Sequence, residues 1–166
     1  MSTIVEQAPA NDLYEADFYL WTLEQAALLR AKRWNDLDLE NLVEEVESMG
    51  RALKSELRNR LAIVIAHLLK WRYQPGRQGK SWRNTLREQR GQIRELLNDA
   101  PSLASYPEQV LSKVYLAATL DAEQQTGIDV SVFPDLCPFS IGQILDQDFY
   151  PPDIGRYDQS GMEDTN

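Results

Sequence analysis

Apolar residues recur every three or four positions along most of the chain, which is the spacing of an amphipathic helix. The clearest stripe has twelve members: Leu39, Leu42, Val43, Val46, Met49, Leu53, Leu57, Leu61, Val64, Ile65, Leu68 and Leu69. It predicts one very long helix over about 38–73. The helix is expected to end before Pro75, because a proline disfavours the helical conformation of the preceding residue. Gly50 leaves two alternatives open, a kink in this helix or a break.

The same spacing predicts shorter helices on both sides of the long one. Their expected ranges, in chain order, are 17–33, 82–98, 107–125 and 141–146. Asp17 and Ser81 have side chains that can cap the first two of these helices. Gly127 is placed to end the third. Ser140 and Gln143 have the spacing of a capping box at the start of the last.

Helices that each carry an apolar stripe must pack against one another, so the sequence predicts an all-α fold. We expect a helical bundle of three to five helices, with one very long helix (about 38–73) and a short C-terminal helix. Residues 1–12 lack periodicity and are expected to form a flexible arm. Residues 13–150 form the expected single helical-bundle domain. Residues 151–166 are acidic and nearly free of apolar side chains, so a flexible tail is expected there.

The charge along the chain is distributed unevenly. The protein has a net charge of -9, with 43% hydrophobic and 26% charged residues, which is typical of a soluble globular protein. Residues 51–94 carry twelve basic and two acidic side chains, whereas the segments before and after them have net charges of -8 and -11. A basic segment in an acidic protein is therefore a candidate for a specific role.

The sequence also limits the compartment and the chemistry. Cys137 is the only cysteine, which excludes an intrachain disulfide and a cysteine metal cluster. The first twelve residues lack the charged and apolar regions of a signal peptide. No apolar run approaches the roughly 20 residues that cross a bilayer. We therefore expect a cytoplasmic protein that does not enter a membrane.

The basic segment is the main candidate for a binding surface. Guanidinium groups bind phosphate oxygens, and aromatic rings stack on bases. The candidate anion- or phosphate-binding residues are Trp71, Arg77, Lys80, Trp82, Arg83, Arg87, Arg90 and Arg94. The segment lacks the spacing of a P-loop, so nucleotide hydrolysis is not indicated.

A structural role for the same arginines is the favoured alternative. The arginines at 83, 87, 90 and 94 recur at helical intervals, and Glu40, Glu44 and Glu47 form an acidic stripe of their own. We expect these two stripes to pair, because the acidic remainder of the chain would repel nucleic acid. A mixed arrangement, with an exposed cluster around Arg77 and Lys80, stays open.

Metal and nucleophile chemistry have weaker support. Helical bundles bind metals through inward glutamate and histidine side chains, and Glu44, Glu47 and His67 are weak candidates. One histidine cannot complete the paired Glu-x-x-His motifs of a di-iron site. Cys137 lies in a proline-bounded turn without an activating neighbour. We find no catalytic motif and no indication of a cofactor.

Six segments resemble a known family. They are DFYLW (17–21), LLRAKRWNDLDLENLVEEVESMGR (28–51), HLLKWRYQP (67–75), SWRNTLREQR (81–90), APSL (100–103) and TGIDVSVFPDLCPFSIGQILDQDFYP (126–151). In order and spacing they are similar to the bacterial, largely cyanobacterial family called domain of unknown function 29. The resemblance implies an all-helical fold over about 14–151. It implies no catalytic residues, since no activity is established for the family.

We therefore expect a non-enzymatic interaction or regulatory module with protein partners. One alternative is nucleic-acid or phosphate-ligand binding through the basic segment 70–94. A second is a metal-assisted enzyme that uses carboxylates and His67. A homodimer formed through the long helix is also compatible with the pattern.

Overall fold

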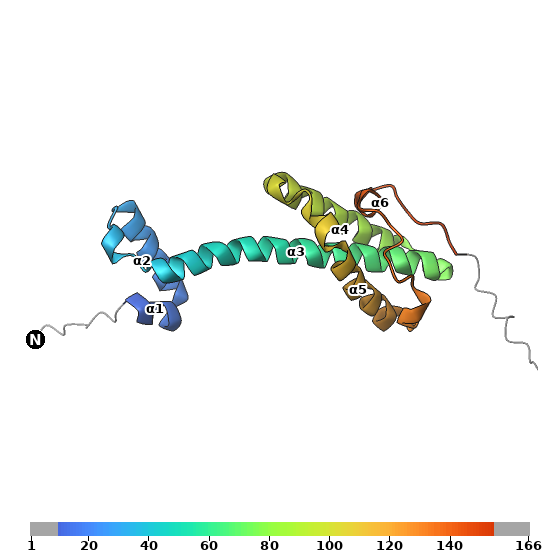
Figure 1. The fold of residues 1–166 in the computed structure, drawn as a ribbon, viewed down its shortest axis with the longest axis horizontal. Coiled ribbons are helices and arrows are strands. Elements are labelled where there is room, and N and C mark those ends of the chain that lie inside the picture. The colour runs from blue at the N-terminus through green and yellow to red at the C-terminus, as the bar shows by residue number, and fades with distance from the viewer. Residues whose placement is uncertain (1–9, 155–166) are drawn as a thin grey trace, which may run out of the picture. The chain divides into compact units, whose positions relative to one another are not determined.

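The structure is a computed structural model that describes residues 10–154, with side chains from residue 13 onward. Its α-helices are α1 (Ala10–Ala16), α2 (Phe18–Arg30), α3 (Leu39–Tyr73), α4 (Lys80–Asp99), α5 (Tyr106–Thr126) and α6 (Ile141–Leu145) (Figure 1). The described residues contain no strand, which confirms the all-α prediction. None of the helices within this range is both long enough and apolar enough to span a bilayer.

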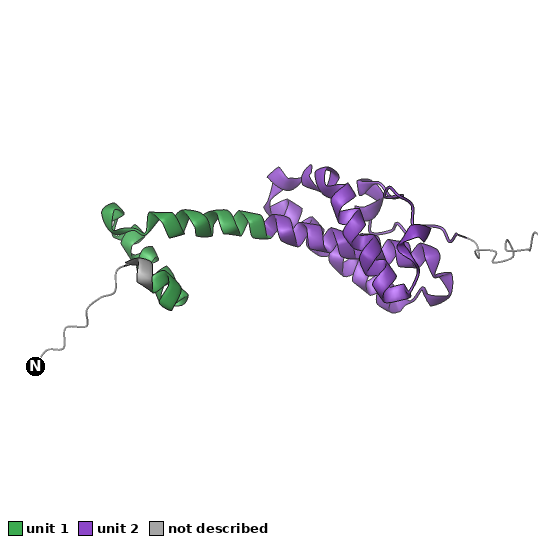
Figure 2. Ribbon diagram, turned by 60° about the horizontal axis from the view of Figure 1, so that its bottom comes forward, with its two compact units in different colours: residues 1–52 green, residues 53–166 purple. Residues whose placement is uncertain are grey.

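The predicted very long helix is confirmed. α3 is 35 residues long, and its helical hydrogen bonding is uninterrupted at Gly50, so this glycine does not break the helix. The chain divides into two compact units, residues 1–52 and residues 53–166 (Figure 2). The first turns of α3 belong to unit 1 and the remaining turns belong to unit 2.

Unit 1 is held together by a small cluster of aromatic and polar side chains. Among its described residues, only Trp21 and Gln25 of α2 are buried. The Trp21 indole N–H donates to the Asp38 carboxylate (3.1 Å), and the Gln25 side-chain oxygen accepts from the Asp38 backbone N–H (2.9 Å). The Tyr14 hydroxyl donates to the Glu45 carboxylate (2.5 Å), and its ring packs edge-on against Trp21. These contacts attach α1 and α2 to the start of α3.

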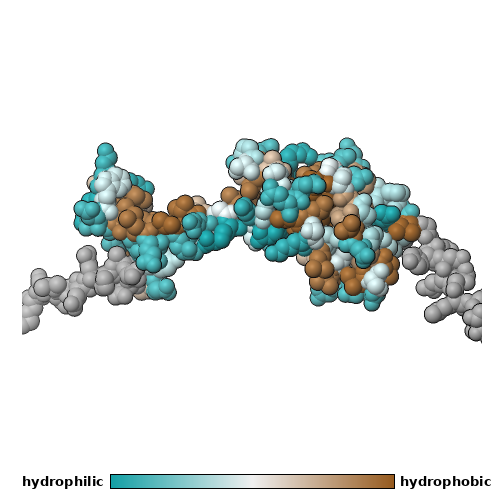
Figure 3. Space-filling view, viewed as in Figure 1, coloured by the Kyte–Doolittle hydropathy of each residue, from teal (hydrophilic) through white to brown (hydrophobic). Residues whose placement is uncertain are grey.

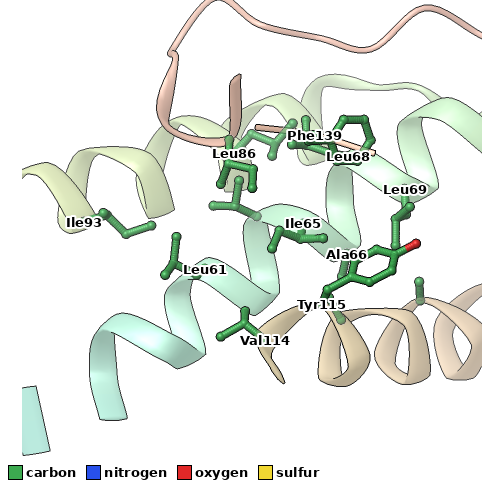
Figure 4. Close-up of a cluster of buried hydrophobic side chains, with 14 of the residues drawn as sticks. Leu61, Ile65, Ala66, Leu68, Leu69, Leu86, Ile93, Val114, Tyr115 and Phe139 are labelled. Atoms are coloured by element: carbon green, nitrogen blue, oxygen red, sulfur yellow. The ribbon is translucent and has the colours of Figure 1, made fainter. Parts of the chain in front are cut away.

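Unit 2 contains the hydrophobic core. Side chains of α3, α4, α5 and the segment before α6 converge there, as Figure 4 shows for Leu61, Ile65, Leu86, Ile93, Val114, Tyr115 and Phe139. The buried residues of α3 begin at Leu57 and continue to Trp71. The C-terminal half of the predicted stripe is therefore covered by neighbouring helices of the same unit.

Local sequence signals set most helix ends as predicted. Asp17 caps α2 by accepting a hydrogen bond from the backbone N–H of Leu20 (2.9 Å). α5 is followed by Gly127, whose φ of 74° is the left-handed conformation that favours glycine. Ser140 and Gln143 form the predicted capping box at the start of α6.

The prediction that Ser81 caps α4 is wrong. The helix begins at Lys80, and the preceding Gly79 is its N-cap residue, without a side-chain hydrogen bond. Ser81 lies inside the helix, where its carbonyl accepts from the Thr85 hydroxyl (3.2 Å). A serine that follows a glycine-containing loop therefore does not by itself determine the first residue of the helix.

Both chain ends are ordered further than the periodicity suggested. α1 begins at Ala10, inside the segment expected to be a flexible arm, while residues 1–9 lie outside the described range. At the other end Pro151 is buried, and the backbone N–H of Ile154 donates to the Arg72 carbonyl (3.3 Å). The rest of the expected acidic tail lies beyond the described residues.

Arg90 attaches the C-terminal segment to α4. Its side chain is 1% exposed, and its guanidinium donates to three backbone carbonyls, those of Ile144 (2.8 Å), Phe149 (3.0 Å) and Gln143 (3.4 Å). The expectation that Arg90 belongs to an exposed anion-binding surface therefore needs correction. Its Nε and Nη2 groups donate to carbonyls of its own chain.

Replacing Arg90 with alanine would leave these carbonyls without their donor. We expect the free energy of unfolding to fall by about 3 kcal/mol or more, because a buried polar group without a partner costs about 1–3 kcal/mol. Urea unfolding followed by circular dichroism measures the change. Arg87→Ala, which removes an exposed arginine from the same helix, is the matched control and should change the value by less than about 0.5 kcal/mol. Equal losses in the two variants would contradict the structural role of Arg90.

Candidate functional site

A cavity of about 490 Å³ lies in unit 2, where the end of α3, the first half of α4 and the segment after α6 meet. Its lining residues are Trp71, Arg83, Arg87, Gln147, Asp148 and Tyr150. We call this cavity the basic–aromatic pocket. It contains three of the residues that the sequence predicted for anion binding, Trp71, Arg83 and Arg87.

Aromatic rings form one wall of the basic–aromatic pocket. The ring of Trp71 is buried, and its centroid lies 4.7 Å from that of the half-buried Tyr150. The guanidinium carbon of Arg83 lies 5.4 Å from the Trp71 centroid, and that of Arg90 lies 6.0 Å from the Tyr150 centroid. These are cation–π distances. Trp71 therefore holds the Arg83 side chain at the wall of the cavity.

The charged groups of the pocket are not neutralised by ion pairs. Arg83 and Arg87 are four residues apart on α4, so they lie on the same side of that helix. Both are exposed, and within unit 2 neither forms an ion pair among the described residues. Asp148, also exposed, uses its backbone N–H to bind the Asp146 carboxylate (3.0 Å). The pocket thus presents two free guanidinium groups and one carboxylate.

The remaining predicted residues are not part of this lining. Arg77 is exposed in the connection between α3 and α4, and Lys80 is exposed at the first position of α4. The ring of Trp82 packs against the Lys70 ammonium group, which lies 4.8 Å from the ring centroid. Arg94 lies beside the pocket and contacts one of its lining residues. Its guanidinium donates to the Gln147 amide oxygen (3.2 Å) in the amide orientation that satisfies both polar atoms of Gln147.

The acidic stripe expected to neutralise these arginines belongs to unit 1. Glu44 and Glu47 of α3 both pair with Arg51 of the same helix, at 2.5 and 3.6 Å. Glu47 and Arg51 have the i,i+4 spacing of helical ion pairs, and Glu44 reaches Arg51 from two turns away on the same helix. Glu44 and Glu47 are therefore engaged locally.

Unit 1 carries a second candidate site, an exposed apolar surface. Ten large apolar side chains of this unit are at least 43% exposed: Phe18, Tyr19, Leu20, Leu23, Leu29, Trp34, Leu39, Val43, Val46 and Met49. We call them the unit 1 apolar surface. Figure 3 shows brown, apolar atoms over α2 and the first turns of α3. Phe18, Tyr19 and Leu20 are consecutive helical residues, so the exposed apolar side chains occupy more than one side of α2, whereas those of α3 form one stripe.

A family model described as Domain of unknown function DUF29 matches residues 13–150. The chain belongs to this family. The matched DUF29 range extends from α1 to Tyr150, so it includes the unit 1 apolar surface and the basic–aromatic pocket. No curated protein and no solved structure matches the chain.

The weak metal candidates of this DUF29 chain have other roles. Glu44 and Glu47 bind Arg51, and the His67 Nδ1 atom lies 2.9 Å from the Ile63 carbonyl oxygen, one turn earlier in α3. From residue 13 to residue 154, no three histidine, cysteine, aspartate or glutamate side chains are grouped to hold a metal ion.

Cys137 shows no sign of an activated thiol. Its Sγ atom donates to the Phe139 carbonyl (3.4 Å), and burial raises the pKa of the thiol. A raised pKa reduces the thiolate fraction, which is the nucleophilic form. The side chain packs against the hydrophobic core instead.

Sequence reasoning missed Gln147, Asp148 and Tyr150, which complete the basic–aromatic pocket. They follow α6 in a segment without periodicity, so nothing in the local pattern placed them beside α4. An unused signal was Tyr150 itself, an aromatic residue immediately before the Pro-Pro pair. It needed a packing partner, and the structure provides Trp71.

Burial of His67 makes stability depend on pH. Desolvation lowers the pKa of His67 below 6.5, and the neighbouring Lys70 lowers it further. As the pH falls below about 6.5, the unfolded chain binds a proton that the folded chain does not bind, so stability decreases. We expect the free energy of unfolding to drop between about pH 7 and pH 5. The drop should be smaller in His67→Gln, which can still donate to the Ile63 carbonyl. Urea unfolding at several pH values tests this, and identical pH profiles for both proteins would refute it.

Proposed function

We propose that the protein is a non-enzymatic interaction module that binds a protein partner through the unit 1 apolar surface. The observation that carries the proposal is the contrast between the two halves of one apolar stripe on α3. The half that begins at Leu57 is buried by α4 and α5, whereas the half from Leu39 to Met49 is exposed.

The contrast is clearest for residues on the same side of α3. Eighteen residues make five turns of an α-helix, so positions 18 apart point in the same direction. Leu39, Val43 and Val46 are 60%, 56% and 66% exposed, whereas Leu57, Leu61 and Val64, each 18 residues later, are 0%, 1% and 0% exposed. The side chains are of the same kind. What differs is whether another helix covers them.

Exposed apolar surface that is continuous is typical of interaction sites. Leu39, Val43, Val46 and Met49 lie on one side of α3, so one partner surface can cover them together. The exposed apolar side chains of α2 can extend that contact toward the roughly 800 Å² per partner of a stable interface. Covering a half-exposed leucine or valine contributes roughly 1 kcal/mol, so several such side chains supply useful affinity.

The charge around the surface indicates the chemistry of the partner. Residues 13–52 contain nine acidic and four basic side chains. Glu40, Glu44 and Glu47 lie on exposed positions of α3 beside its apolar stripe. A partner helix with an apolar stripe and basic flanking residues would be complementary in both respects. A straight helical stripe favours a helix as the matching surface.

Site-specific photo-cross-linking in the cells that naturally produce the protein tests this proposal. A photoreactive amino acid at position 46 lies at the centre of the exposed stripe, and a second one at position 124, an exposed site on α5, is the control. We expect a discrete adduct from position 46 alone. Met49→Glu should abolish it, because a buried carboxylate within the apolar interface is unfavourable.

The adduct also identifies the kind of partner. Peptide mass fingerprinting should find a different protein that contains a basic amphipathic helix. An adduct of two 19.0 kDa chains would show a homodimer instead and would overturn the basic-partner part of the proposal. Absence of a discrete adduct at position 46, or equal products at positions 46 and 124, would overturn the interaction role of this surface.

A further inference from the structure

We infer that the basic–aromatic pocket of unit 2 binds a phosphorylated ligand with a flat ring, of the size and chemistry of a nucleoside monophosphate. The inference is independent of the proposed protein-binding role, because all lining residues belong to unit 2. Three features of the pocket carry it: unneutralised guanidinium groups, an aromatic wall, and two polar side chains that can bind the edge of a ring.

The guanidinium groups are suited to a phosphate. Arg83 and Arg87 project from successive turns of α4, and each can donate two parallel hydrogen bonds to an oxyanion. Because Arg83 already packs against Trp71, its side chain loses less conformational entropy when a ligand binds. A phosphate monoester carries up to two negative charges near neutral pH, which matches two arginines better than a single carboxylate does.

Arg90 adds positive charge behind the aromatic wall. Its guanidinium is buried 6.0 Å from the Tyr150 centroid and is bound to backbone carbonyls, so no salt bridge neutralises it. One of its terminal nitrogens, Nη1, is buried without a hydrogen-bond partner. An anion in the pocket would be stabilised by this third charge as well.

The other lining groups favour a ligand with a ring. The half-buried Tyr150, which packs against Trp71 and lines the pocket, provides an aromatic ring for a flat ligand ring to contact. Asp148 can accept hydrogen bonds from a ring amino group, and the Gln147 amide N–H groups can donate to a ring nitrogen or oxygen. The volume of about 490 Å³ lies within the usual range of about 300–1,000 Å³ for small-molecule sites.

Two comparisons argue against less specific ligands. The first comparison is with a second cavity of unit 2, of about 230 Å³, whose lining includes Glu56, Glu95 and Asp99. That lining repels anions, so anion binding is not expected at every cavity of the unit. A polynucleotide would need a basic groove that continues beyond the pocket. Asp148 lies at the pocket instead, and a carboxylate there repels further phosphates. A mononucleotide therefore fits the local charge better than a strand does.

Isothermal titration calorimetry of the full chain at low salt tests the inference. The probes are adenosine monophosphate, adenosine, inorganic phosphate and a single-stranded ten-residue oligonucleotide. We expect adenosine monophosphate to bind at least about tenfold more tightly than adenosine or phosphate, since only the monophosphate uses both the arginines and the rings. Arg87→Ala should weaken this binding at least tenfold, and Asp148→Asn should weaken it several-fold. Lys113→Ala, which removes an exposed positive charge from α5, is the control and should leave it unchanged.

Each other outcome overturns part or all of the inference. Equal binding of phosphate and adenosine monophosphate would remove the role of the rings. Tighter binding of the oligonucleotide, strengthened in Asp148→Asn, would show a nucleic-acid surface in place of a mononucleotide pocket. If the unaltered protein binds none of the four probes, the inference is overturned completely. None of these outcomes bears on cross-linking at position 46.

Discussion

The apolar stripe of α3 is longer than the set of helices that covers it, and much of the structure follows from this mismatch. From Leu57 onward α4 and α5 bury the stripe, and the resulting core gives unit 2 its cohesion. From Leu39 to Met49 the same stripe has no comparable cover within unit 1, where Trp21 and Gln25 are the buried side chains of the described part. Apolar surface removed from water stabilises a fold in proportion to its area, so burial of the stripe stabilises unit 2 far more than unit 1.

α4 carries both a structural arginine and two arginines that line the basic–aromatic pocket. Arg90 is directed at the C-terminal segment and satisfies three of its carbonyls, while Arg83 and Arg87 remain exposed on the neighbouring side. By fixing the residues near Phe149, Arg90 also holds the segment that supplies Asp148 and Tyr150 to the pocket. Arg90 thus positions those two side chains in addition to placing a buried positive charge 6.0 Å from the Tyr150 ring centroid.

Features governed by local chemistry could be predicted from the sequence. The stripe of α3, the Asp17 cap, the left-handed Gly127 and the capping box at Ser140 each depend on residues a few positions apart. Features governed by distant contacts could not. Periodicity shows that Val46 and Val64 face the same way, but not that a helix covers only the second. It places Arg90 on a helix with Arg83 and Arg87, but its carbonyl partners lie more than 50 residues away. Tyr150 is likewise distant in sequence from the Trp71 ring that it meets.

Amide hydrogen exchange along α3, measured on dilute purified protein, tests the central claim most directly. Exchange reports the free energy of local opening, which depends on how well each turn is packed. If the N-terminal half of the stripe is uncovered, amides of residues 40–50 should exchange at least about 100-fold faster than those of residues 60–70, a difference of roughly 2.7 kcal/mol. Uniformly slow exchange along the whole helix in the monomeric protein would contradict the account, because it would mean that unit 1 is stable without a partner.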